Sequence, residues 1–384
     1  MNQLSIDNLN ERLRQPNIPS LDGIRAVAVV MVIFYHLGIP GTPRGDHGVM
    51  AFFVLSGFLI TWLLLKEDSE YGNVSLSAFY KRRILRIFPA FYCFWFVSVI
   101  TLLAERQKIA WGPFLSSFFY AGNYWFGITN RGDEIMGMSW SLAVEEQFYL
   151  LWPLFFLIFR HDLRKLTTAL VTIVVGVSIY RVILVFYTHT PFNYLEYAFD
   201  TRLDDLMVGC LLAVLLKRRV LSKFWVFACR QSYAPVITVL LLAALVSASR
   251  CFSFDYRHVI AFAVEPALIA VLLVQVVALG SAPLWTWLNW SWVRYVGRIS
   301  YPLYLYHLFA LNQSQLILNG HRLRYVDPTM IALSFALASG SYFFVEKPFL
   351  ALKKKATPRA KGRKADPGGV WRSTNPADVA DKRR

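Results

Sequence analysis

Long apolar runs recur along almost the whole chain and restrict its possible folds more than any other feature. A helix needs about 20 predominantly apolar residues to cross a bilayer. Runs that approach this length lie at residues 23–39, 48–65, 87–104, 140–159, 166–187, 202–216, 233–249, 259–280, 299–318 and 328–345. Because lipid offers no water to backbone polar groups, such runs fold as helices. The chain has 384 residues, 56% of them hydrophobic, and it is predicted to be an all-α, polytopic membrane protein with about ten transmembrane helices around a central cavity.

The stretches outside these runs set the expected domain boundaries. Residues 1–20 are polar, and because no cleavable small-residue site follows the first run, we expect no secretory signal. Residues 21–350 form the predicted transmembrane domain. Within it, the stretch 113–128 is apolar but short and broken by glycine and asparagine, which is typical of an interfacial or re-entrant segment. Residues 351–384 are basic and poor in large apolar side chains, so a disordered tail is predicted there.

Clusters of lysine and arginine occur in alternate loops and give the expected orientation. They follow the second, fourth, sixth, eighth and tenth runs, whereas the other loops carry few or balanced charges. Because such clusters face the cytoplasm, both termini are expected to be cytoplasmic. The formal net charge of +16 is then explained by membrane topology, and nucleic acid is not an expected partner.

Two ionisable residues, Arg25 and His36, lie along the first run. They are eleven positions apart, about 20° past three helical turns, so on a helix they point the same way, roughly 16 Å apart. The sequence between them is almost wholly apolar. A charge that faces lipid is costly, so both residues are expected to face the bundle interior as functional groups. The plainer alternative is that Arg25 is a surface anchor and His36 a satisfied interfacial histidine.

Three arginines, Arg82, Arg83 and Arg86, precede the third run. Arg82 and Arg86 share a helix face, and guanidinium groups suit phosphate oxygens. The alternative is that the cluster only anchors the helix on the cytoplasmic side. The expected topology brings Arg25 to the same end, and together these arginines predict a positive pocket of phosphate size.

Two adjacent carboxylates, Glu145 and Glu146, lie near the start of the fourth run, where they need partners. Ser141 and Glu145 share a helix face, which the expected orientation puts at the depth of His36. Because a carboxylate beside a histidine orients the ring and raises its basicity, we expect Glu145 to contact His36. The alternative is that Ser141 caps the helix and the glutamates stabilise its first turns.

Further polar residues lie in the sixth and ninth runs. Arg202, Asp204 and Asp205 are expected to contain an internal ion pair, with substrate contact as the alternative. Tyr304 and His307 are three positions apart and are candidates for packing or for substrate contact. The four cysteines have no metal-ligand spacing, so neither a disulfide nor a metal site is expected.

Several segments follow one another in a recognisable order: LDGIRAVAVVMVIFYHLG, GVMAFFVLSGFLIT, YKRRILRIFPAFY, WSLAVEEQFYLLWP, GRISYPLYLYH and YFFVEKPF. Over roughly residues 18–350 the chain thereby resembles the acyltransferase-3 family of bacterial integral membrane acyltransferases. One departure is Met50, where the family often has aspartate. The chain resembles members of the O-acetyltransferase type without a C-terminal esterase-like domain, so acyl transfer is expected to finish within the membrane domain.

The resemblance implies an activity. Family members move an acyl group, commonly acetyl from acetyl-CoA, to a hydroxyl of a cell-surface polysaccharide, lipopolysaccharide or other glycosylated acceptor. The family motifs fall on residues already noted: Arg-x10-His on Arg25 and His36, the arginine cluster on Arg82, Arg83 and Arg86, and Ser-x3-Glu on Ser141 and Glu145.

A mechanism can be expected from these assignments. The arginines bind the phosphates of CoA, His36 acts as the base, and Glu145 holds its ring; an acyl-histidine intermediate is the alternative route. The expected partners are acyl-CoA as donor substrate, a glycan or glycolipid acceptor, and the lipids of the bacterial cytoplasmic (inner) membrane, with no metal. One rival hypothesis is a transporter or flippase of envelope glycan precursors, with the same residues as a proton or anion relay. Another is a noncatalytic component of glycan assembly.

Overall fold

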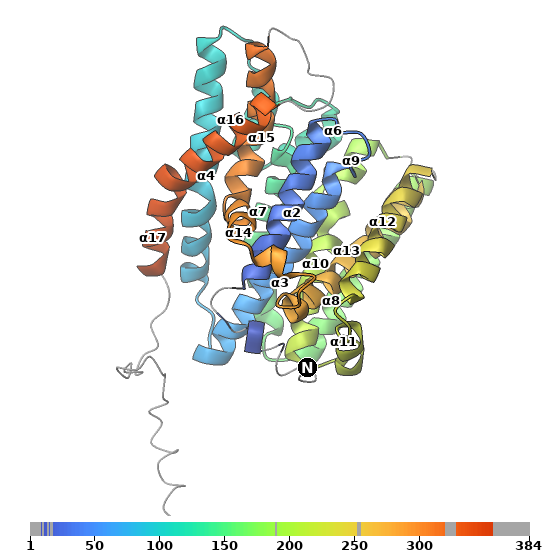
Figure 1. Ribbon diagram of the computed structural model, residues 1–384. Coiled ribbons are helices and arrows are strands. Elements are labelled where there is room, and N and C mark those ends of the chain that lie inside the picture. The colour runs from blue at the N-terminus through green and yellow to red at the C-terminus, as the bar shows by residue number, and fades with distance from the viewer. Residues whose placement is uncertain are drawn as a thin grey trace, which may run out of the picture.

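The computed structural model describes residues 18–188, 190–251, 255–318 and 328–355, together with residues 9, 11–13 and 15. In these parts of the chain the regular structure is helical, without strands. Long helices run side by side through the molecule (Figure 1). They are α2 (Pro19–His36), α3 (Gly45–Tyr71), α4 (Leu76–Ala104), α7 (Ser139–Phe159), α8 (Leu163–Phe186), α10 (Phe199–Lys217), α12 (Ala234–Cys251), α13 (Phe262–Leu279), α15 (Ser300–Ile317) and α16 (Pro328–Gly340). Shorter elements connect or extend them: α5 (Trp111–Phe118), α6 (Gly122–Thr129), α9 (Phe192–Tyr197), α11 (Ser222–Ala228), η1 (Tyr256–Ala261), η2 (Thr286–Asn289), α14 (Ser291–Arg298), η3 (Ser341–Glu346) and α17 (Lys347–Lys355).

The predicted all-α, polytopic membrane fold is confirmed, because each apolar run of the sequence coincides, to within a few residues at its ends, with one of the long helices or with a long helix and its extension. Seven helices of the described chain are long and apolar enough to span a membrane by length and composition. They comprise α2, α3, α4, α7, α8, the continuous helix of η1 and α13, and the continuous helix of α16, η3 and α17. The charged helix α10 instead packs inside the bundle against α3 and α8, where charges can find partners.

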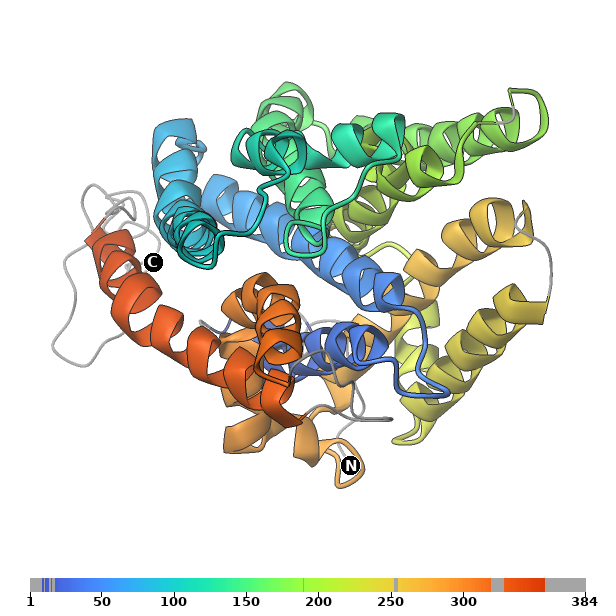
Figure 2. The same cartoon turned by 90° about the horizontal axis from the view of Figure 1, so that it is seen from above.

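The central helix α3 crosses the middle of the molecule (Figure 2) and packs against α2, α7, α10 and α13. Its contact with α10 is close because glycines lie at the crossing. A Cβ added to Gly57 would lie 2.0 Å from the carbonyl oxygen of Leu206, and one added to Gly209 would lie 2.1 Å from that of Val54. The absence of side chains at these two positions therefore lets the two backbones touch.

Local sequence accounts for several helix ends. At the start of α4, the hydroxyl of Ser75 accepts a hydrogen bond from the backbone N–H of Ala78, and Asp162 caps α8 in the same way. The central helix α3 ends at Gly72, whose φ of 68° lies in the left-handed region that favours glycine. Because α4 begins directly after Ser75, the arginine cluster is itself helical.

The described part of the N-terminal segment is not a free polar end. Residues 11–13 are helical, and Arg12 donates a hydrogen bond of 2.8 Å to the carbonyl oxygen of Ala278, at the C-terminal end of α13. The indole of Trp62 in α3 donates to the carbonyl oxygen of Leu13 at 3.0 Å. This short segment is therefore tied to the bundle at two points.

Two other stretches can be compared with their predictions. Residues 113–128 form most of α5 and α6, two short helices in place of a span. The helix α17 continues to Lys355, because alanine, leucine and lysine are strong helix formers, so residues 351–355 of the predicted disordered tail are helical. The rest of that tail, 356–384, lies outside the described residues.

Candidate active site

Two cavities lie at opposite ends of α2. The first has a volume of about 310 Å³ and is lined by Arg25, Arg83 and Arg86; we call it the arginine cavity. The second has a volume of about 370 Å³ and is lined by His36; we call it the histidine cavity. Arg25 and His36 thus line different cavities, one near the start of α2 and the other at its end.

Three arginines and three carboxylates, those of Asp22, Glu145 and Glu146, line the arginine cavity, and within the described residues only Arg25 among these arginines forms an ion pair. Arg25 forms an ion pair of 3.2 Å with Asp22, one turn earlier in α2. The guanidinium of Arg83 lies over the ring of Tyr149, 5.1 Å from its centroid. Within the described residues, neither Arg83 nor Arg86 forms an ion pair. A multiply charged anion could therefore bind both guanidinium groups.

Arg82 does not join this cluster. Its guanidinium donates a hydrogen bond of 2.7 Å to Glu67 in α3, and Glu67 also accepts one from the backbone N–H of Ser75. Arg82 and Arg83 point about 100° apart, on either side of Arg86, and Glu67 of α3 lies on the Arg82 side. The prediction that Arg82 lines the phosphate pocket is therefore wrong.

Glu145 also lies away from its expected partner. Its carboxylate accepts a hydrogen bond of 2.8 Å from Ser56, and Tyr149 donates to the same serine hydroxyl at 3.1 Å. Glu145 lines the arginine cavity and lies within electrostatic reach of Arg83 and Arg86. The expected contact between Glu145 and His36 is thus wrong, because Glu145 lies one helical turn, about 6 Å, beyond Ser141 along α7.

A row of polar side chains connects the two cavities. Ser141 and the Tyr304 hydroxyl lie 2.6 Å apart, and both groups can donate to the carbonyl oxygen of Met138. The ring centroid of Tyr304 is 5.5 Å from that of His307, which is 4.9 Å from that of His36. Ser141 is therefore a partner of Tyr304, and α7 begins earlier, after Met138, so Ser141 does not cap it.

Hydrogen bonds to the backbone define how the two histidines present their nitrogens. His36 Nδ1 lies 2.9 Å from the carbonyl oxygen of Val32, and His307 Nδ1 lies 2.6 Å from that of Tyr304. A carbonyl oxygen only accepts, so in the neutral ring each Nδ1 is assigned the proton and each Nε2 keeps its lone pair. His307 is fully buried, whereas His36 opens onto the cavity.

Charged and aromatic residues line the rest of the histidine cavity: Arg44, Asp46, Asp133, Glu134, Trp140, Glu196 and Tyr197. Arg44 forms ion pairs with Asp46 at 3.4 Å and with Glu196 at 3.6 Å. Burial raises the pKa of the Asp133 carboxyl, against the lowering effect of two backbone N–H donors. The lining therefore holds more carboxylates than cations, together with the aromatic faces and amides on which sugars commonly bind.

A buried set of ion pairs lies beside this cavity. Arg202 pairs with Asp205 at 3.1 Å, as the sequence predicts, and its guanidinium lies 4.1 Å from the ring centroid of Phe262. Arg181 binds both oxygens of Asp204, at 2.7 and 2.6 Å. Arg202 does not line either cavity. The Arg181–Asp204 pair joins α8 to α10, and the contact of Arg202 with Phe262 joins α10 to α13.

Sequence reasoning missed several groups that the structure brings into these networks, among them Arg181 and Ser56. Arg181 interrupts an otherwise apolar run, which is a usable signal, because an arginine inside a membrane helix needs a partner. Ser56 carries no such signal, because serines in helices commonly bond their own backbone. Among the described residues, no group of three or more His, Cys, Asp or Glu side chains could hold a metal ion.

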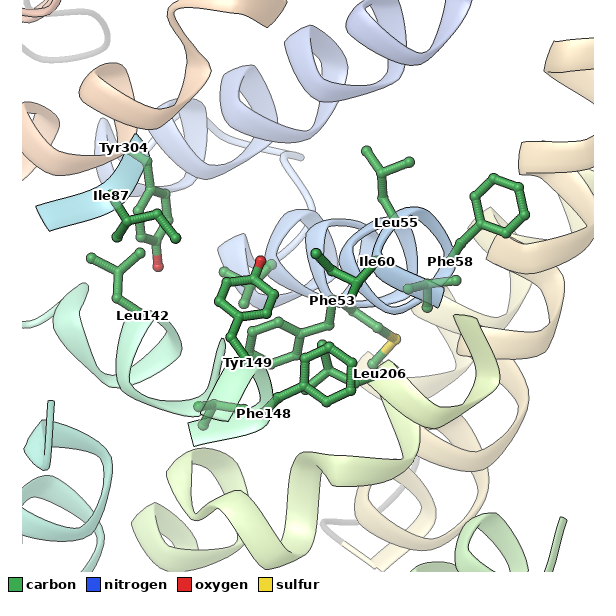
Figure 3. Close-up of a cluster of buried hydrophobic side chains, with 14 of the residues drawn as sticks. Phe53, Leu55, Phe58, Ile60, Ile87, Leu142, Phe148, Tyr149, Leu206 and Tyr304 are labelled. Carbon is green, nitrogen blue, oxygen red and sulfur yellow. The ribbon is translucent and has the colours of Figure 1, made fainter. Parts of the chain in front are cut away.

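The two cavities meet at Tyr304. Tyr304 and Val49 line both of them. Figure 3 shows the Tyr304 side chain extending from α15 toward Leu142 of α7. A molecule in the arginine cavity and one in the histidine cavity would therefore come nearest to each other beside this ring.

Comparison with known proteins identifies the chain's relatives. Residues 18–344 match the sequence model of a family described as an acyltransferase domain. The peptidoglycan O-acetyltransferase OatA of Listeria monocytogenes is 31% identical over 364 residues, 88% of this chain and 56% of the relative. The putative peptidoglycan O-acetyltransferase YrhL of Bacillus subtilis is 31% identical, over 86% of this chain and 54% of the relative. The O-acetyltransferase OatA of Staphylococcus aureus is 30% identical, over 92% of this chain and 61% of the relative.

The chain spans 54% to 61% of the length of these relatives. No solved structure matches it. The family match covers most of the chain and includes the helices that form both cavities. The chain therefore belongs to the acyltransferase-3 family of membrane acyltransferases.

Proposed function

We propose that this protein transfers an acyl group, in the first place acetyl, from acyl-CoA to a hydroxyl of a cell-surface glycan. The observation that carries the proposal is the pair of cavities that meet at Tyr304, one lined by arginines and the other by His36. An anionic donor suits the first cavity, and a neutral alcohol suits a cavity that contains a free imidazole nitrogen. The names of the relatives, peptidoglycan O-acetyltransferases, support a polysaccharide acceptor.

The arginine cavity is the proposed donor site. In this proposal the protein lies in the bacterial inner membrane, both of its termini are cytoplasmic, and the arginine cavity opens to the cytoplasm. Arg25, Arg83 and Arg86 would bind the phosphates of CoA, since guanidinium forks match phosphate oxygens. Beyond them the cavity is lined by apolar side chains that include Phe52 and Leu59, which suit the pantetheine arm. The acyl group would then lie nearest to Tyr304.

His36 is the proposed base. The Val32 carbonyl oxygen holds the Nδ1 proton, so Nε2 is free to accept the proton of the acceptor hydroxyl. The hydroxyl oxygen attacks the thioester carbonyl carbon, the carbon–sulfur bond breaks, and the departing thiolate takes the proton back from the imidazolium. A second route uses the same nitrogen as a nucleophile, with an acyl-histidine that the acceptor then attacks.

The experiment is label transfer by the purified full-length protein in lipid nanodiscs. Acetyl-CoA labelled in the acetyl group is incubated with an envelope glycan fraction, and the glycan is separated and counted. We expect label on the glycan, and mild base should release it, as an ester requires. A transporter or a noncatalytic assembly component would leave the glycan unlabelled, and that result would overturn the proposal.

The expected orientation has its own test. In proteoliposomes with a known insertion direction, acetyl-CoA supplied at the Arg25 end and glycan supplied at the His36 end should give label. Supplying both substrates only at the His36 end should give none, because CoA cannot cross the bilayer. Equal labelling in both arrangements would exclude the proposed donor side.

A further inference from the structure

We propose that Tyr304 limits the length of the acyl chain that this enzyme can transfer. The inference rests on the proposed function and assigns one residue a role in choosing the donor. In the described chain, only Tyr304 and Val49 line both cavities. Tyr304 is the larger of the two, so its ring sets the space between them.

The Tyr304 ring is held firmly in place. Its hydroxyl lies 2.6 Å from the Ser141 hydroxyl and donates to the Met138 carbonyl oxygen at 3.2 Å. The rings of Phe52 and His307 pack against it, with centroids at 6.4 and 5.5 Å. Only 6% of the residue is exposed. A side chain fixed on several sides cannot easily turn away for a larger group.

The position of the ring determines what it would exclude. Donor and acceptor react where the two cavities meet, so the carbonyl carbon of the acyl group must lie beside Tyr304. The rest of the acyl chain extends beyond that carbon. The single methyl of an acetyl group needs little room there, whereas each further methylene must displace the ring or fold back into the arginine cavity. A pocket of this kind discriminates by about 10–200-fold per methylene.

The test compares acetyl-CoA, propionyl-CoA and butyryl-CoA as donors for the full-length protein with the same glycan acceptor. In the wild type we expect kcat/KM to fall with each added methylene. In Tyr304→Ala the space of the ring becomes free, and the butyryl-to-acetyl ratio of kcat/KM should rise by about tenfold or more. A ratio that stays at the wild-type value in Tyr304→Ala would overturn the inference.

Two further variants isolate the volume of the ring. Tyr304→Phe keeps the ring and loses its hydrogen bonds, so its ratio should remain close to that of the wild type. Tyr301→Ala removes a tyrosine one turn earlier on α15 that lines the arginine cavity alone and donates to the Ile87 carbonyl oxygen at 3.2 Å. It should change KM for all three donors alike. If the butyryl-to-acetyl ratio of kcat/KM rose as much in Tyr301→Ala as in Tyr304→Ala, the role would not be specific to Tyr304.

Failure of this inference can be told apart from failure of the proposed function. If the wild type transfers no acetyl group, the proposed function fails. If the wild type and Tyr304→Ala both transfer acetyl and neither accepts butyryl, only the role of Tyr304 fails. Should Tyr304→Ala not fold, Tyr304→Leu tests the same point, because leucine is smaller than tyrosine and the ratio should again rise.

Discussion

At the scale of single residues, His36 has one ring nitrogen occupied and one free. The Val32 carbonyl oxygen holds Nδ1 at 2.9 Å, so catalysis by this residue has to use Nε2. We predict that His36→Gln, which can still form hydrogen bonds but has no basic nitrogen, lowers kcat by about 10²–10⁴-fold. Affinity for CoA, measured by calorimetry, should stay nearly unchanged, because His36 does not line the arginine cavity. Turnover at the wild-type rate would exclude His36 from the chemistry.

Two adjacent arginines are expected to behave differently. Arg83→Ala removes a cation from the arginine cavity and should raise KM for acyl-CoA by about tenfold, which corresponds to the loss of one charge-assisted contact. Arg82→Ala instead breaks the 2.7 Å contact with Glu67. It should lower the free energy of unfolding by about 1–3 kcal/mol with little effect on KM.

These two variants are distinguished by donor kinetics together with thermal unfolding in detergent. The charge lost is the same in both, and the residues are neighbours in the sequence, so each is the matched control of the other. If Arg82→Ala and Arg83→Ala raised KM for acyl-CoA equally, Arg82 would also contact the donor, which its position beside α3 does not predict.

For single residues, the sequence predicts which side chains share a helix face but not which side chains they contact. The spacing of Arg25 and His36 predicts that they lie along one face of a helix, and the structure places them in cavities near its start and at its end. The pairing of Glu145 with His36 could not be tested from sequence, because a side chain's partner depends on which neighbouring helix lies at its depth. That neighbour is α3, whose Ser56 has no distinguishing pattern in the sequence.

At the scale of elements, the crossing of α3 and α10 depends on two residues without side chains. We predict that Gly57→Ala and Gly209→Ala each destabilise the protein by about 1–3 kcal/mol, because the new Cβ would lie about 2 Å from a backbone carbonyl oxygen of the other helix. The matched control is Gly176→Ala in α8, where nothing lies within 4 Å of an added Cβ. It should stabilise the protein by about 0.5–1 kcal/mol.

The measurement is the midpoint of thermal unfolding of each variant in the same detergent. If all three substitutions raise the midpoint, helix propensity and not the close crossing would govern the effect.

The sequence predicts where the helices lie along the chain, but not which helices pack against one another. Apolar length alone predicts where the spans lie, because lipid permits few alternatives to a helix. The helix α10 departs from that simple pattern, with Asp200, Arg202, Asp204 and Asp205 near its start. Its charges are explained only by the neighbours that surround it in the structure, above all Arg181 of α8.

At the scale of the whole molecule, the sequence predicts a single central cavity, whereas the described residues form separate cavities at the two ends of α2, which share Tyr304 and Val49. Such a division depends on how one aromatic side chain packs between helices, and periodicity carries no information about that. It separates a cavity in which three arginines lie among three carboxylates from one in which four carboxylates lie beside a single arginine. The histidine cavity should therefore disfavour anionic ligands more strongly than the arginine cavity does.

This polarity predicts which acceptors are favoured. Asp46 and Glu196 in the histidine cavity are paired with Arg44, whereas Asp133 and Glu134 form no ion pair within the described chain. Neutral glycans should therefore be better acceptors than uronate-containing glycans of the same length. We predict that Glu134→Lys raises kcat/KM for the uronate-containing acceptor by on the order of tenfold and leaves the neutral acceptor nearly unchanged. The gain should shrink as salt is added, because an exposed charge is screened.

The control for this prediction is Glu105→Lys, which reverses one exposed carboxylate near the same end of the molecule. Glu105 accepts a hydrogen bond from Gln313 of α15, close to Asn312 and Gln315 in the cavity wall, but does not itself line the cavity. If the local field of the cavity selects the acceptor, Glu105→Lys should change the ratio of the two acceptors much less than Glu134→Lys does. If both variants change it equally, net charge at this end of the molecule governs the encounter, and the cavity lining has no selective role.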